Sequence, residues 1–180
     1  MATPALAFAQ LANECEKDGL SHKNAERIGS ELSKTFSVQI DEVGILKLEK
    51  QHLIFVYPQK LATVGSIPLN TVGAVAARTA NTKRAEAINS FAQTKHISVF
   101  EAVELGGGQQ AKLGPMGEAK KEVHTIQKLM SAPVLGAEGV VGVIEICRKG
   151  TSAPAAGPDF SPADLQKLVA IAGSLAKCFK

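Results

Sequence analysis

Two apolar runs, Ile126 to Leu135 and Val140 to Cys147, stand on either side of a four-residue segment that begins and ends with glycine. Runs of this length, rich in Val, Ile and Leu and joined by a short glycine-containing turn, are typical of a β-hairpin. Pro133 has no backbone N–H to donate, so we expect it at an edge or a bulge. Because strands joined by a short turn pair antiparallel, the hairpin predicts an antiparallel sheet.

A helix with a complete start signal follows the hairpin and a Gly/Pro-rich loop over residues 150–159. Ser161 is the expected N-cap, and Pro162 suits the first helical position. Asp164 can reach back to the backbone N–H of the cap, while Phe160 and Leu165 have the spacing of a hydrophobic staple. Apolar side chains then recur at helical spacing, so this helix is expected to bury one face.

The rest of the chain alternates between helical and extended patterns. Residues 1–36 predict two amphipathic helices, with one stripe at Phe8, Leu11 and Cys15 and a second helix capped by Ser21. Further expected elements are a hairpin at 43–49 and 53–57, an extended piece at 67–69, a short helix at 71–79, an extended piece at 87–91, a helix at 98–104 and a loop at 106–117.

This order of elements, with SAPVLGAEGVVGVIEICRKG followed by DFSPADLQKLVAIAGSLA, resembles the GAF domain family. The strand Gly142 to Ile146 with Arg148–Lys149 matches the strand end typical of the family, and Phe160 with Asp164 matches the start of its last helix. The segment GSIPLNTVGAVAARTA is similar to the family's short helix beside the ligand pocket. The resemblance covers roughly residues 37–178.

The resemblance implies an α/β (α+β) fold with a central antiparallel sheet of about six strands. Helices from both ends of the chain would cover one face, and loops and short helices would roof a pocket on the other. We expect a single domain, with residues 1–36 as helices packed on a GAF-like body at 37–180. Members of the family bind cyclic nucleotides, bilins, haem, amino acids or other small molecules, and many act as dimer modules with no known ligand.

Specialised members of the family differ from this chain at key residues. The cyclic-nucleotide pattern has Asn and Glu where this chain has Arg148 and Leu165, so that ligand is not expected. The bilin-attaching pattern often places His after its Cys, whereas Arg148 follows Cys147. The methionine sulfoxide reductases of the family use clustered cysteines, but Cys15, Cys147 and Cys178 are far apart in sequence. We therefore expect no enzyme, with Cys147 the one residual route to redox chemistry.

The composition of the chain restricts the classes of molecule that it is expected to bind. The 20 basic and 17 acidic side chains leave a formal net charge of +3, and the chain has no Trp and a single Tyr, so nucleic acid is not expected. No apolar run has the length of a membrane helix, and three scattered cysteines fit reduced thiols in the cytoplasm. The four histidines lack paired spacing, so no metal is expected. No cofactor is identified by the sequence.

The candidate ligand site lies in the segment from Arg78 to Glu101, which the resemblance places over the pocket. This segment lacks clean periodicity and mixes polar and aromatic side chains, as small-molecule sites do. The candidate residues are Arg78, Thr79, Asn81, Asn89, Phe91, His96, Phe100 and Glu101. In the alternative interpretation, Phe91 and Phe100 fill the pocket themselves.

Glu145 interrupts the apolar strand Val140 to Cys147. Alternation places it on one face with Val141, Val143 and Cys147. If that face is enclosed, Glu145 needs a partner, either Lys128 from across the hairpin or a ligand.

Two functions remain open. One is a small-molecule-sensing or signalling domain with an unidentified ligand. The other is a dimerisation or partner-docking module with a vestigial pocket. In both cases we expect a homodimer through the terminal helices, because surplus apolar helix surface usually marks a contact, and a signalling protein as a possible partner.

Overall fold

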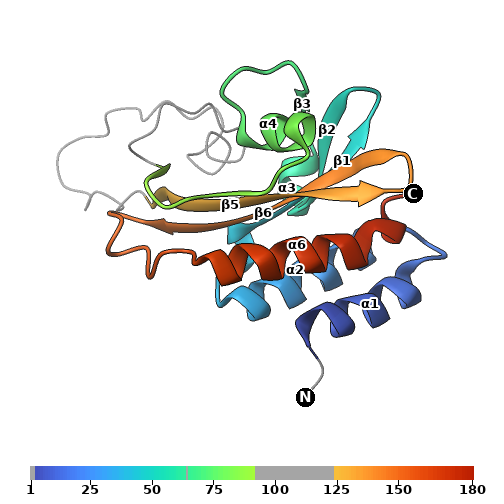
Figure 1. Cartoon of the computed structure of the whole chain (residues 1–180), viewed down its shortest axis with the longest axis horizontal. Helices are drawn as coiled ribbons and strands as arrows, with labels where there is room; N and C mark the ends of the chain where they lie inside the picture. The colour runs from blue at the N-terminus through green and yellow to red at the C-terminus, as the bar shows by residue number, and fades with distance from the viewer. Residues whose placement is uncertain (1–2, 64, 92–123) are drawn as a thin grey trace, which may run out of the picture.

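The computed structural model describes residues 3–63, 65–91 and 124–180. Its centre is a six-stranded sheet in which every neighbouring pair of strands is antiparallel, in the order β3-β2-β1-β6-β5-β4 (Figure 1). The strands are β1 (Val43–Glu49), β2 (His52–Tyr57), β3 (Ser66–Pro68), β4 (Glu86–Ile88), β5 (Thr125–Gly136) and β6 (Gly139–Gly150). The predicted six-stranded antiparallel sheet is confirmed.

Helices from both ends of the chain cover one face of this sheet. Figure 1 shows α2 (His22–Phe36) and α6 (Pro162–Leu175) beneath the strands, with α1 (Pro4–Cys15) farther from the sheet. The buried face of α1 is the predicted stripe, including Phe8 and Leu11, and it joins the same apolar core as α2, α6 and the sheet. Two short 3-10 helices, η1 (Ile40–Glu42) and η3 (Ala176–Cys178), complete this side.

The opposite face carries α3 (Gln59–Ala62) and α4 (Val75–Thr82) over a second apolar core. The helix expected at 71–79 therefore begins four residues later than predicted. Thr71 N donates instead to Pro68 O in a turn, and Gly73 has φ +87°, which is incompatible with a right-handed helix. The helix and loop expected at 98–104 and 106–117 lie outside the described residues.

The hairpin predicted at 126–147 is the β5–β6 pair. Its turn joins Gly136 to Gly139, and Pro133 lies beyond the Leu129–Ser131 segment that pairs with β4. A bulge follows at once, between Val134 and Leu135. Pro133 thus has the edge and bulge surroundings that its missing N–H predicts.

The start of α6 is capped as predicted. Ser161 Oγ accepts a hydrogen bond from Asp164 N at 3.1 Å, and Ser161 N donates to Asp164 Oδ2 at 2.9 Å. We expect Ser161→Ala to lower the free energy of unfolding by about 1 kcal/mol, measured by urea denaturation. Ser174→Ala, on the same helix, removes only an exposed bond to the carbonyl of Ala170 and is the control. Equal stability of the two variants would contradict the role of the cap.

Candidate functional site

Three buried polar side chains meet between the sheet and α4. Glu145 on β6 lies opposite Ser131 on β5, and Thr79 on α4 reaches the same point. Thr79 and Ser131 are fully buried, and Glu145 is 3% exposed. We call these three residues the polar cluster. It lies within the second apolar core, next to Val143 and Cys147 on β6.

The polar cluster is a chain of hydrogen bonds that runs from Thr79 through Ser131 to Glu145. Thr79 Oγ1 donates to Ser131 Oγ at 2.8 Å, and Ser131 in turn hydrogen-bonds to the Glu145 carboxyl group. An ionised carboxylate only accepts, so the Ser131 hydroxyl is the donor to it. Burial raises the pKa of Glu145 to about 7; the Ser131 hydrogen bond lowers it and the nearby charge of Glu86 raises it further. Glu145 therefore changes protonation near neutral pH.

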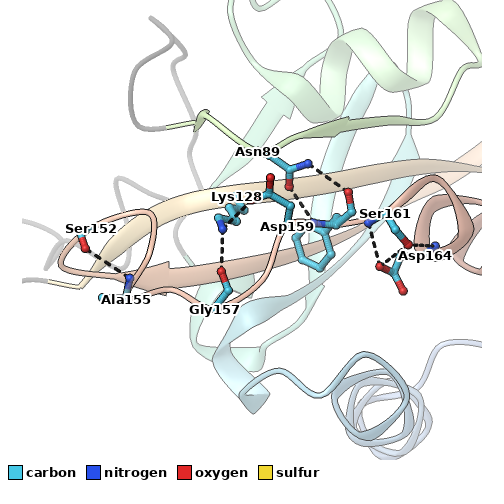
Figure 2. A network of polar contacts seen from close by, with 9 residues as sticks. Asn89, Lys128, Ser152, Ala155, Gly157, Asp159, Ser161 and Asp164 are labelled. Atoms are coloured by element: carbon cyan, nitrogen blue, oxygen red, sulfur yellow. Dashed lines mark hydrogen bonds and ion pairs between the residues drawn. The ribbon is translucent and has the colours of Figure 1, made fainter.

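The prediction that Lys128 forms an ion pair with Glu145 is wrong. Lys128 lies opposite Arg148 in the hairpin register, and its Nζ donates to Gly157 O at 2.6 Å and contacts Asp159 Oδ1 at 2.7 Å (Figure 2). Lys128 thus ties the loop at 150–159 to the sheet. The partner that the structure gives Glu145 is instead the hydroxyl of Ser131.

Arg78 and Asn81, two predicted site residues, are engaged within the protein. Arg78 forms a two-pronged ion pair with Glu86, from Nε to Oε1 at 2.8 Å and from Nη2 to Oε2 at 2.9 Å. The Glu86 hydrogen bond raises the pKa of Arg78. Asn81 Nδ2 donates to Leu69 O at 2.6 Å. These contacts fasten the middle and the C-terminal part of α4 to its surroundings.

Asn89 and Phe91 also have structural contacts. Asn89 Nδ2 donates to Phe160 O at 3.0 Å, and Phe160 N donates to Asn89 Oδ1 at 2.8 Å, so this amide clamps the entry to α6 (Figure 2). Phe91 is 1% exposed and packs in the second apolar core. The candidates His96, Phe100 and Glu101 lie outside the described residues.

Thr79 is thus the predicted candidate that joins the polar cluster, and Ser131 is the member that the sequence interpretation missed. Pro133 was the sequence feature that indicated a bulge in β5 and so a shift of its register. If the hairpin continued from the Gly136–Gly139 turn without a bulge, Met130 would lie opposite Glu145. The bulge between Val134 and Leu135 shifts the register by one residue and places Ser131 there instead. A one-residue slip turns every side chain of a strand to the other face.

The three cysteines are free and buried. Burial raises the pKa of the Cys147 thiol well above its usual range, so this side chain stays protonated at neutral pH. Within residues 3–63, 65–91 and 124–180, no three His, Cys, Asp or Glu side chains gather as metal ligands would. No helix in the described part of the chain has the length and apolar character needed to cross a membrane.

Comparisons with known proteins identify the fold. No family model matches the chain, and no curated protein matches it in sequence. Among solved structures, the GAF domain of an Acinetobacter phosphoenolpyruvate-protein phosphotransferase is similar, with TM-score 0.63 and 12% identity over 99% of this chain and 94% of the other. A methyl-accepting chemotaxis protein is similar with TM-score 0.62 and 10% identity over 93% of both chains. The chain has the fold of a GAF domain, as the resemblance predicted.

A third similar structure corrects one prediction. A free methionine-R-sulfoxide reductase from Neisseria meningitidis, in complex with its substrate, has TM-score 0.57 and 15% identity over 99% of this chain and 92% of the other. The prediction that this chain is not an enzyme is therefore wrong, because the fold does not exclude enzymatic activity. The reasoning rested on scattered cysteines, and the fold itself is compatible with an enzyme.

Proposed function

We propose that this protein is a small-molecule-sensing GAF domain whose ligand binds at the polar cluster. The observation that carries the proposal is Glu145, a buried carboxylate on the sheet face beneath α4. A buried ionisable group costs folding free energy unless it has a partner or a function. Similar structures support the proposal, because they include a chemotaxis protein and a reductase that binds a substrate.

Binding at this site would be coupled to movement of α4. Glu145 is 3% exposed, so a ligand that reaches it must displace α4 or its neighbours from the sheet. Thr79 links α4 to Ser131, and the ion pair of Arg78 with Glu86 links α4 to β4. Movement of α4 would therefore also move β4, the edge strand of the sheet, and a signalling partner could bind to the altered edge. The three free thiols support a reducing compartment such as the cytoplasm.

Native mass spectrometry of the protein purified without denaturation tests this function. We expect a retained small molecule on the wild type and its loss from Glu145→Gln. The matched control is Glu138→Gln, which makes the same change in the exposed turn of the same hairpin. Retention that is equal in all three proteins would place the molecule elsewhere and contradict the proposed site.

A dimerisation module is the second candidate, favoured by the outer surface of the terminal helices. A groove of about 640 Å³ runs between α1 and α2, with Phe8 and Leu11 among its apolar lining. Leu6 on α1 and Val169 on α6 are 51% and 46% exposed. Two copies of this surface would bury apolar side chains that water now contacts.

For this candidate we expect light scattering at micromolar concentration to give twice the mass of one chain. Leu6→Glu would place a charge in the contact and should shift the population to monomer. The control is Val72→Glu, because Val72 is 88% exposed and lies on the other side of the sheet, before α4. A monomeric wild type would exclude the dimer.

A further inference from the structure

We propose that the polar cluster recognises an organic cation, such as a protonated amine or an amidine carried on a small apolar group, through an ion pair with Glu145. This inference rests on the proposed function and names the class of its ligand. The residues that carry it are Glu145 itself, the cations around it and the apolar side chains of the same face.

No cation of the protein neutralises Glu145 within the described residues. Arg78, on the helix above, gives both prongs of its guanidinium group to Glu86. Lys128, on the neighbouring strand, is held by Gly157 and Asp159. Among the described residues, the carboxylate therefore has no cationic partner, and an opposite charge would stabilise its ionised form there.

The carboxyl group can accept more hydrogen bonds than Ser131 alone supplies. A carboxylate offers about four lone-pair sites, whereas a hydroxyl has one hydrogen to donate. On the other flanking strand, the register partner of Glu145 is Gly44, which has no side chain to donate. An ammonium or amidinium group brings several N–H donors at once and matches this vacancy better than a single hydroxyl does.

The side chains around Glu145 determine which chemical groups the rest of the ligand can carry. Leu129, Val143 and Cys147 on the same sheet face belong to the apolar core, and Thr79 and Ser131 are used within the polar cluster. A ligand whose cationic end meets Glu145 must therefore place apolar atoms against these side chains. A second anionic group on the ligand would find no free cation in the described part of this face.

Binding of a cation should require ionised Glu145. In the described part of the chain, the titratable groups near it are Glu86 on β4, which is paired with Arg78 on α4, and the neutral thiol of Cys147 on β6. Since the pKa of Glu145 is about 7 without ligand, a cation that remains charged throughout should bind about tenfold more tightly at pH 8 than at pH 6. Binding should also release a proton near neutral pH.

The experiment uses four probes that share a benzene ring: benzylamine, benzamidine, benzyl alcohol and benzoate. Binding to the full chain is followed by backbone-amide NMR in every protein, and the carboxyl carbon of Glu145 is followed as well, after labelling of glutamate with ¹³C, in the proteins that keep this residue. We expect the two cations to bind, to lower the pKa of Glu145 and to bind more tightly at pH 8. Glu145→Gln should weaken the cations about tenfold or more and leave benzyl alcohol unchanged, while Glu138→Gln should change nothing.

Three results would overturn the inference. These are tighter binding of benzoate, equal binding of alcohol and cations, or failure of both cations to bind. The wild-type probe series and its pH dependence decide the matter even if Glu145→Gln fails to fold. A retained natural ligand without a cationic group would overturn this inference and leave the proposed function standing, whereas the absence of any ligand would count against both.

Discussion

The stability of this protein should fall by about 3 kcal/mol between pH 4.5 and pH 7 through Glu145 alone, because burial raises the pKa of this carboxyl from 4.5 to about 7. Between these two values the folded state holds a proton that the unfolded state has released. The unfolded state therefore binds fewer protons, and the free energy of unfolding decreases as pH rises. The stability contributed by protonated Glu145 is fully present below pH 4.5 and is lost above pH 7.

Urea denaturation at a series of pH values measures this effect as the difference between the wild type and Glu145→Gln. Glutamine does not titrate, so the difference should change by about 3 kcal/mol across the window, in the direction that favours the variant at high pH. Glu138→Gln in the exposed turn should follow the wild type. A difference that stays constant with pH would mean that Glu145 titrates normally in the folded protein.

The second large effect is expected at Gly142, the fourth residue of β6. A Cβ atom there would collide with the carbonyl oxygen of Leu46 on β1 and with the ring of Phe179. Neither can yield freely, because the first is backbone of the neighbouring strand and the second is buried against the sheet. We expect Gly142→Ala to destabilise the protein by about 2–3 kcal/mol through overpacking.

Gly173→Ala is the matched control for this variant. Gly173 lies in α6, and a Cβ atom there has no neighbour within 4 Å. Replacement of a helical glycine by alanine removes backbone entropy from the unfolded chain, so this change should stabilise the protein by up to about 1 kcal/mol. Thermal denaturation of both variants tests the pair, and a Gly142→Ala protein as stable as the wild type would contradict the close approach of β6 and β1.

The elements that could be predicted from sequence are those whose signals are local. The Ser161–Asp164 cap is formed by residues three apart, and the β5–β6 hairpin follows from alternation around a glycine turn. The start of α4 was misplaced because Gly73 adopts a positive φ, which the apolar spacing of the segment does not reveal.

The candidate site was harder to predict, because its contacts depend on packing between distant segments. Thr79 meets Ser131 across 52 positions of sequence. The partner of Glu145 depends on a bulge that shifts the register by one residue, and Lys128 is diverted by the backbone of a loop. Asn89 looked like a ligand group, but both of its amide atoms hold Phe160, a contact that no local pattern indicates.

The location of bound ligand tests the central claim most directly. The molecule released by denaturing the natively purified protein would be added back to ligand-free protein and followed by backbone-amide NMR. We expect the largest shift changes at Thr79, Ser131 and Glu145, with smaller changes along α4. Shift changes confined to the groove between α1 and α2, with these three amides unmoved, would contradict a ligand site at the polar cluster.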